Sequence, residues 1–307
     1  WSVEPNTIFT THGLVNGTAL CIHAFTKPGD SVILFTPVYH AFARVIKAAG
    51  RDVLESRLVN NNGRYELDLD TLQAQLTGKE TMLIFCSPHN PGGRVWTPAE
   101  LVSVALFCEK NNLLLVSDEI HHDLVFEGNT HTVMPNAAPD MMHRIVTMTA
   151  ASKTFNLAGA HSGNVIISDA RLHKQFSDAL MSYGISGNSF GLTLTEAAYN
   201  DGEDWLIQLI AYLDENRKVF DAGINAIPGL RSMPLQATYL AWVDFSSTGM
   251  SHDEIKSRVK NDARIATNDG PSFGSGGDFF QRFNLACPRA QVKEAVARMQ
   301  RAFADIQ

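Results

Sequence analysis

Four short apolar runs, each followed directly by polar or aromatic residues, constrain the fold of this chain more than any other feature. They span residues 31–35, 82–86, 113–116 and 144–149. Each has the length and composition of a buried strand, and stretches of helical character lie between them. One such stretch begins with a capping box from Thr97 to Glu100 and leads back into the third run. The alternation predicts right-handed βαβ units in one doubly wound α/β domain that continues to about Ser168.

One chemically distinctive side chain follows each run. Tyr39 comes after the first run, Asn90 after the second, Asp118 after the third and Lys153 after the fourth. In an open α/β sheet, ligands bind at the carboxyl ends of the strands, so we expect these side chains to meet in one site. A lone lysine at a strand end usually extends along the surface into water, and this alternative holds for Lys153 taken by itself. The aromatic ring, the amide and the carboxylate that accompany it favour a chemical role.

Four segments carry a resemblance to a known family. They are SPHNPGG at residues 87–93, VSDEIH at 116–121, TAASKTFNLAG at 149–159 and RFNLACPR at 282–289. They resemble the signature segments of fold-type I pyridoxal-phosphate (PLP) enzymes, the aspartate aminotransferase superfamily, and most of all its MalY/PatB branch of cystathionine β-lyases, also called cysteine C–S lyases. The resemblance extends over nearly the whole chain. It implies a large PLP-binding domain at residues 1–203, with a doubly wound, mostly parallel sheet, and a linking helix with a smaller C-terminal α/β domain at 204–307.

The resemblance implies PLP as the cofactor and a role for each strand-end residue. Lys153 would bind the cofactor covalently and then act as general base for the substrate Cα proton. Asp118 would pair with the pyridine nitrogen, while Asn90 and His121 would hydrogen-bond the ring 3′ oxygen. Tyr39 would stack on the pyridine ring. Taken alone, Tyr39 also fits a core tyrosine with a bonded hydroxyl, and Asp118 also fits a helix cap.

The cofactor phosphate is expected at the start of the first helix. A helix N-terminus presents free backbone N–H groups, and a helical pattern follows Gly13, Leu14 and Val15. An ordinary helix start is the alternative, but the family's phosphate site implicates these three residues together with Ser152. The wider superfamily often has a phosphate-binding arginine eight residues after the lysine, where this sequence has His161.

Arg282 matches the arginine that holds the substrate α-carboxylate through a bidentate ion pair. A surface ion pair is the alternative for an arginine considered in isolation. The implied reaction is the α,β-elimination of L-cystathionine or a related cysteine S-conjugate to thiol, pyruvate and ammonia. The same cofactor core supports transamination, so an aminotransferase of amino acids is the second hypothesis. A cofactor-binding regulatory protein with little turnover is the third, and the intact Lys153, Asp118 and Arg282 argue against it.

Composition narrows the class of protein. The 307 residues are 45% hydrophobic and 19% charged, as in a globular protein with more than one domain. The formal charge of −7 and the lack of basic runs argue against nucleic-acid binding. The four cysteines and eleven histidines show no metal-ligand spacing, so we expect no metal. No apolar stretch has transmembrane length and no signal peptide is recognised, so we expect no membrane contact and a cytoplasmic protein.

The resemblance also implies an assembly. Members of the family form homodimers with active sites at the interface, so we expect a homodimer. The chain begins at Trp1 without a methionine. Family members carry a substantial N-terminal segment before this region, and that segment contributes substrate contacts. We therefore expect a truncated sequence, a feature that favours the regulatory hypothesis over a fully active enzyme.

Overall fold

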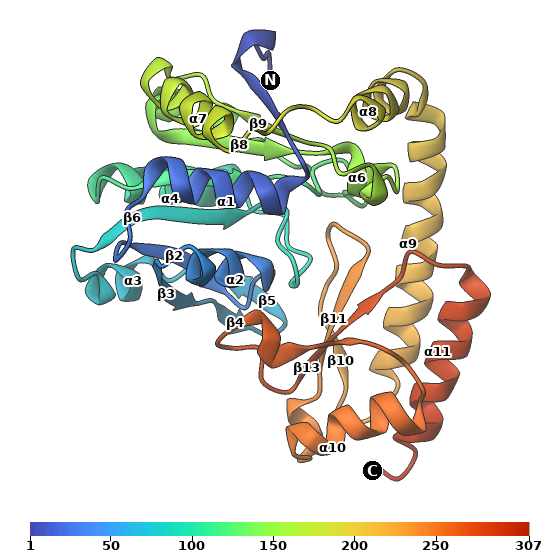
Figure 1. The fold of residues 1–307 in the computed structure, drawn as a ribbon. Coiled ribbons are helices and arrows are strands. Elements are labelled where there is room, and N and C mark those ends of the chain that lie inside the picture. Colours follow the sequence, from blue (N-terminus) through green and yellow to red (C-terminus); the bar gives the residue numbers. More distant parts are fainter. Residues whose placement is uncertain (307) are drawn as a thin grey trace.

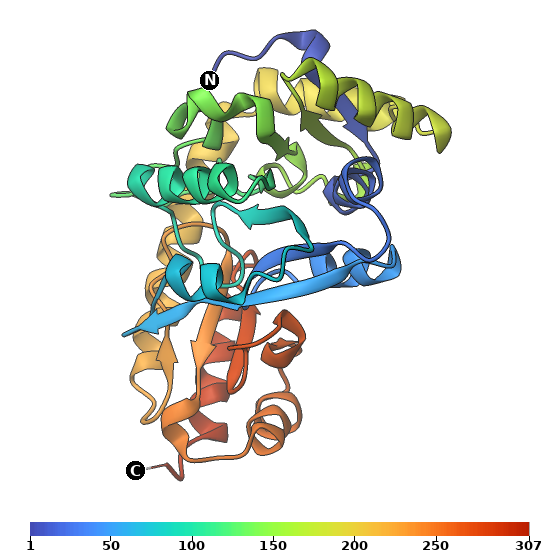
Figure 2. The ribbon, with the colours of Figure 1, turned by 90° about the vertical axis from the view of Figure 1, so that its left-hand side faces the viewer.

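The computed structural model describes residues 1–306, and its largest element is a seven-stranded sheet (Figures 1 and 2). The strands are β1 Ile8–Thr11, β2 Ser31–Thr36, β3 Asp52–Arg57, β6 Glu80–Cys86, β7 Leu114–Asp118, β8 Ile145–Thr149 and β9 Gly163–Ile166. They lie in the order β1-β9-β8-β7-β6-β2-β3. Strands β3, β2, β6, β7 and β8 pair in parallel, and β9 is antiparallel to both of its neighbours. The four predicted strand runs all belong to this parallel part.

Helices cover both faces of the large sheet. The covering helices are α1 Leu14–Phe25, α2 Ala41–Ala48, α3 Leu69–Gln75, α4 Pro98–Lys110, α5 Met134–Ala137 and α7 Ala170–Ser182. Two further helices of this part, α6 Ala151–Thr154 and α8 Ser189–Asp201, contact each other. Successive side chains of a strand point to opposite faces, so each strand contributes to two cores. In β2, Val32 and Leu34 pack in the core that α1, α2 and α7 share. Ile33 and Phe35 pack in the core that α3, α4 and α5 share.

A second, four-stranded sheet lies in the C-terminal part of the chain. Its strands are β10 Arg231–Ser232, β11 Leu240–Asp244, β12 Asn268–Asp269 and β13 Phe280–Asn284, in the antiparallel order β10-β11-β13-β12. The accompanying helices are α9 Glu203–Asn225, α10 His252–Ser257 and α11 Arg289–Ala302. Figure 1 shows α9 running down from α8 to lie beside α11. Phe220, Val243 and Val296 belong to a separate core at this sheet.

The predicted capping box of α4 forms in full, and a similar sequence from Ser251 to Glu254 at α10 forms one in part. The Thr97 hydroxyl accepts from the Glu100 N–H, and the Glu100 carboxylate accepts from the Thr97 N–H at 2.8 Å, so the box of α4 is complete. At α10, the Ser251 hydroxyl accepts from the Glu254 N–H. The Glu254 carboxylate instead pairs with Arg258 at 3.0 Å, because the next turn offers it a charged partner. Only half of the second box is therefore formed.

The observed architecture confirms the predicted fold class, a doubly wound and mostly parallel sheet with a smaller α/β part after it. Helix α9 begins at Glu203, close to the predicted domain boundary, and the division into residues 1–203 and 204–307 stays a prediction. Within residues 1–306, no helix combines the length and the apolarity that crossing a bilayer requires.

Candidate active site

A cavity of about 450 Å³ lies where the carboxyl ends of the parallel strands meet the C-terminal sheet. Its lining contains every residue that the sequence assigned to cofactor, substrate or catalysis. These are Gly13, Leu14, Val15, Tyr39, Asn90, Asp118, His121, Ser152, Lys153 and Arg282, and His161 lines it as well. The structure thus brings together residues that are up to 269 positions apart in the chain, from Gly13 to Arg282. Their individual roles stay predictions.

Lys153 reaches the cavity from α6, which begins directly after β8. The pKa of Lys153 is lowered, chiefly because burial disfavours the charged ammonium and also because Arg282 is near, while Asp118 acts in the opposite direction. A lowered pKa increases the fraction of neutral amine, the form that acts as nucleophile or base. The alternative of a surface lysine extended into water does not fit this position.

Asp118 is the last residue of β7, paired in register with Cys86 on β6 and Met148 on β8. Its side chain is buried and accepts a hydrogen bond from the Ile120 N–H at 3.1 Å. Burial raises the pKa of Asp118 to about 7, and the Ile120 N–H limits the rise. A buried carboxylate with so few partners is costly when ionised, so a cationic or protonated ligand beside it would be stabilised.

Glu119 and His121 follow Asp118 within three residues, and His121 lines the cavity whereas Glu119 does not. His121 is 2% exposed and its Nδ1 has no partner among the described residues, while burial lowers its pKa to about 3. Glu119 is fully buried, where its carboxylate accepts from the Ser117 hydroxyl at 2.9 Å, from His131 Nε2 at 2.8 Å and from the Met134 N–H at 3.0 Å. This network fixes the segment that carries Asp118 and His121. Sequence reasoning did not identify Glu119 or its partner His131.

Arg282 projects from β13, and its guanidinium is held on three sides. Nη1 donates to Asn90 Oδ1 at 2.8 Å and Nη2 donates to Asn268 Oδ1 at 2.7 Å. The guanidinium carbon lies 4.8 Å from the centre of the Phe273 ring. Nε is buried without a partner among the described residues. An arginine held in this way fits a ligand carboxylate better than a surface ion pair.

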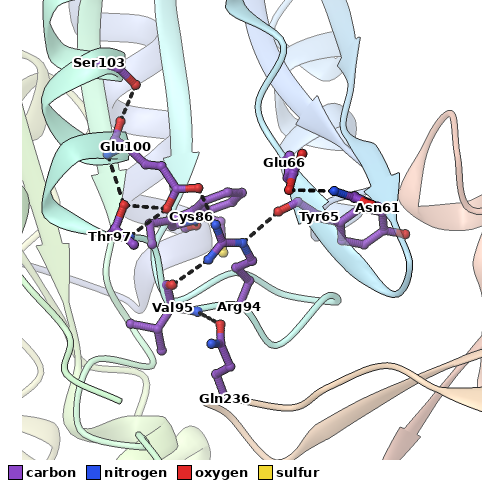
Figure 3. Close-up of polar contacts among 11 residues, drawn as sticks. Asn61, Tyr65, Glu66, Cys86, Arg94, Val95, Thr97, Glu100, Ser103 and Gln236 are labelled. Carbon is purple, nitrogen blue, oxygen red and sulfur yellow. Dashed lines mark hydrogen bonds and ion pairs between the residues drawn. The ribbon is translucent and has the colours of Figure 1, made fainter. Parts of the chain in front are cut away.

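Arg94, four residues after Asn90, anchors the loop after β6, and Figure 3 shows the contacts of its guanidinium. Arg94 is 2% exposed and donates to the Tyr65 carbonyl at 2.7 Å, to the Val95 carbonyl at 2.8 Å and to Glu100. Tyr65 belongs to the hairpin of β4 Val59–Asn61 and β5 Arg64–Glu66. The Val95 N–H donates to Gln236 Oε1 at 3.0 Å, so the same loop is joined to the C-terminal part.

The N-terminus of α1 forms another wall of the cavity. Gly13 is the N-cap residue, with φ 82°, a value that favours glycine. The first N–H groups of any helix lack intrahelical partners, and no side chain caps those of α1, which begins at the wall formed by Leu14 and Val15. Sequence reasoning assigned no role to several other residues of the cavity lining. They include His12, His40, Ser162, Tyr239 and Asn284.

The donor set fits a phosphorylated, aromatic aldehyde such as PLP. The unpartnered Nδ1 of His121 and the underbonded carboxylate of Asp118 can bind polar ring atoms. Tyr39 supplies an aromatic ring, and the N-terminus of α1 supplies N–H donors for an anion. Lys153 supplies the amine that such an aldehyde requires.

Fold and site together define a fold-type I PLP enzyme, and the chain belongs to the aminotransferase class I and II family, whose model matches residues 1–299. It is 35% identical to the cystathionine beta-lyase PatB of Bacillus subtilis (strain 168) over 305 residues, which cover 98% of this chain and 79% of that protein. It is 30% identical to the protein MalY of Escherichia coli (strain K12) over 300 residues, covering 96% and 76%. The crystal structure of cystalysin from Treponema denticola, which contains a pyridoxal 5′-phosphate cofactor, matches with a TM-score of 0.95 and 34% identity. That match covers 99% of this chain and 78% of the cystalysin chain.

Proposed function

We propose that this chain is a PLP-dependent C–S lyase that converts L-cystathionine or related cysteine S-conjugates to thiol, pyruvate and ammonia. The observation that carries the proposal is the placement of Lys153, Asp118 and Arg282 around one cavity. The similarity to PatB, named as a cystathionine beta-lyase, supports elimination over transamination. Aminotransferases belong to the same family, so an aminotransferase of amino acids is the second candidate.

The cofactor would be held by the residues that line the cavity. We assign Lys153 to its aldehyde carbon, Asp118 to its pyridine nitrogen, and Asn90 and His121 to its ring oxygen. Tyr39 would stack on its ring, and Ser152 with the α1 N-terminus at Gly13, Leu14 and Val15 would take its phosphate. When bound, PLP supplies an electron sink for the charge that develops at the substrate Cα.

Arg282 would orient the substrate by binding its α-carboxylate. The guanidinium is already fixed by Asn90 and Asn268, so little side-chain entropy is lost when the carboxylate arrives. A carboxylate held at this point places the Cα–H bond at a defined position relative to the Lys153 amine. Such positioning is a large part of the rate enhancement of enzymes that move a proton between fixed groups.

Lys153 would take the Cα proton as a neutral amine. Burial lowers its pKa and so increases the fraction of neutral amine, and Arg282 contributes to that shift. As the proton leaves Cα, the Cβ–S bond breaks and its electron pair departs with the sulfur as thiolate, which the proton on Lys153 can neutralise. Water then hydrolyses the unsaturated amine that remains, giving pyruvate and ammonia in equal amounts.

The two candidate reactions differ in their products. The purified chain with PLP should release thiol and pyruvate in equal amounts from L-cystathionine, without any added oxo acid. An aminotransferase would instead require an oxo acid such as 2-oxoglutarate and would form the corresponding amino acid. Amino transfer without thiol release would contradict the lyase assignment, and binding of PLP without either reaction would favour the regulatory hypothesis.

We further propose that the chain acts as a homodimer in the cytoplasm. Large apolar side chains are exposed along α7, α8 and α9, and Phe190 is 80% exposed. On α8 only Gly191 is buried, so this helix has nearly all of its surface free to meet a partner. A second copy of the chain is the occupant that the family implies. The exposed apolar residues in this surface are Met181, Tyr183, Phe190, Leu192, Leu194, Tyr199, Trp205 and Ile207.

The cysteines support the proposed location in the cytoplasm. They are unpaired, which fits a reducing compartment.

A further inference from the structure

A second cleft, of about 390 Å³, lies at the amino ends of the parallel strands, at the opposite edge of the large sheet from the active-site cavity. It is lined by Thr81 near the start of β6, Leu114 at the start of β7 and Arg144 directly before β8. The end of α1 and the first turns of α7 complete the wall. No residue of this cleft also lines the active-site cavity, so the two are separate.

Three lysine and arginine side chains line this cleft, and its lining contains no acidic residue. Lys27 lies between α1 and β2, Arg144 precedes β8, and Arg171 lies in the first turn of α7. None of the three forms an ion pair within residues 1–306, although ion pairs hold many other lysines and arginines of the chain. The chain has 32 acidic and 25 basic residues, so its composition does not explain a cleft lined by cations alone.

The guanidinium of Arg144 is held in place and keeps a free edge. Nη1 donates to the Leu113 carbonyl at 3.0 Å, and Nε donates to His143 Nε2 at 3.2 Å. Nη2 donates to no described residue. Because the side chain is half-buried and already fixed, it would lose little conformational entropy on binding an anion.

A buried arginine without an acidic partner lies behind the same wall. Arg51 is 7% exposed, and it donates from Nε to the Thr26 hydroxyl at 2.9 Å and from Nη2 to the Thr26 carbonyl at 2.8 Å. Thr26 itself lines the cleft. Hydroxyl and carbonyl oxygens satisfy the donors of Arg51 but do not cancel its charge. The charge of Arg51 therefore adds to the positive potential in the cleft.

The acidic residues next to the cleft in sequence are engaged elsewhere. Asp30 accepts from the Lys27 backbone N–H at 2.8 Å and from the Thr81 hydroxyl at 3.2 Å, and it lies outside the lining. Glu80 accepts from N–H groups of the turn before β6, and Asp169 caps α7. These carboxylates reduce the positive potential, but the side chains of the three cations remain free to bind an anion.

We propose that this cleft binds a small polyanion, a phosphorylated or polycarboxylate ligand with at least two negative charges, through Lys27, Arg144 and Arg171. The proposal goes beyond the C–S lyase chemistry and does not depend on it. Guanidinium groups bind phosphate and carboxylate oxygens through paired N–H bonds, which are stronger than bonds between neutral groups. Asn112 and Gln175 add polar side chains to the lining, and Gln175 Oε1 accepts from Arg171 Nη1 at 3.4 Å.

The test titrates inorganic pyrophosphate and citrate into the chain with and without bound PLP, and calorimetry gives the dissociation constants. At least one of the two anions should bind equally well to both forms. Acetate, with a single charge, should bind about tenfold more weakly or less. The anion that binds more tightly shows whether the cleft prefers phosphate or carboxylate. Raising the salt from about 0.05 M to about 0.5 M should weaken the binding, because salt screens exposed cations.

Variants at the cations assign the binding to this cleft. Arg171→Gln removes a charge at an exposed position and should weaken the binding about tenfold, whereas Arg171→Lys keeps the charge and should weaken it less. Arg144→Gln should weaken it by a similar factor. Lys174→Gln removes a charge from the same helix outside the lining, at a side chain that is 75% exposed. This matched control should change the dissociation constant less than about twofold.

Equal affinities of Arg171→Gln and the wild type, or no binding of either anion to the wild type, would overturn the proposal. If Arg144→Gln does not fold, because its guanidinium also holds the Leu113 carbonyl, Arg171→Gln decides. Binding that is lost in Arg282→Lys, or that disappears when PLP is bound, would place the anion in the active-site cavity and overturn the proposal as well. A chain that binds the anion in this cleft but releases no thiol would contradict the proposed function alone.

Discussion

Arg282 on β13 donates from Nη1 to Oδ1 of Asn90 at 2.8 Å, and this bond joins the C-terminal sheet to the loop after β6. The two residues are 192 positions apart in the chain. The cavity therefore depends on the contact between the two parts of the molecule. Asn90, expected to bind the cofactor ring oxygen, also holds the arginine that we propose binds the substrate, and no described residue accepts from its amide nitrogen.

Replacing Arg282 with lysine should impair substrate binding much more than cofactor binding. The ammonium cannot make the two parallel bonds to a carboxylate, so KM for L-cystathionine should rise about 10- to 100-fold. The visible absorption of bound PLP should change little. Arg298→Lys, at an exposed ion pair with Glu294 on α11, is the matched control. An unchanged KM in Arg282→Lys would exclude Arg282 as the carboxylate site.

Asp118→Asn should change how the stability of the cofactor-free chain depends on pH. Burial raises the pKa of Asp118 to about 7 from its usual 3.8, so between these values the folded state binds a proton that the unfolded chain has lost. The contribution of this carboxyl group to the free energy of unfolding is fully present below about pH 4 and is lost as the pH rises through 7.

The asparagine variant lacks this titration. Relative to wild type, its free energy of unfolding should therefore increase by about 2 kcal/mol between pH 5.5 and pH 8. Urea unfolding at both pH values measures the difference, with Asp178→Asn on the exposed face of α7 as control. A difference between variant and wild type that stays constant with pH would contradict the buried, poorly paired state of Asp118.

Removing the carboxylate of Glu119 should destabilise the fold. Its fully buried carboxylate accepts three hydrogen bonds, from Ser117, His131 and the Met134 N–H. Glu119→Ala leaves these donors without an acceptor, at a cost of about 3 kcal/mol or more in the free energy of unfolding. Glu119→Gln keeps one acceptor oxygen and should cost less. Equal stabilities of both variants and the wild type by urea unfolding would contradict a structural role for this network.

A charge on the exposed face of α8 should disrupt the proposed dimer. Phe190→Glu places a carboxylate in the middle of the apolar surface, and burying it against a second copy would be costly. Light scattering after size-exclusion chromatography should show a dimer for the wild type and a monomer for the variant. Leu106→Glu, at an exposed leucine on α4 that is 52% exposed, should remain dimeric. A monomeric wild type would refute the proposed assembly.

The sequence predicted the parallel strands and the residues at their ends, because strand ends are local features. Tyr39, Asn90, Asp118 and Lys153 each follow an apolar run within a few residues, and all four line the cavity. The contacts that hold them were not predictable, because they depend on tertiary structure. Arg94 binds the carbonyl of Tyr65, which no side-chain pattern specifies. His12 lines the cavity only because β1 pairs with β9.

The most direct test of the central claim compares the wild type with Lys153→Ala in an assay of L-cystathionine cleavage with PLP present. Thiol and pyruvate are measured in the same sample. We expect equal amounts of both from the wild type, and a loss of at least about 1,000-fold in the variant, because the amine that moves the proton is absent. Thiol release by Lys153→Ala at the wild-type rate would contradict it.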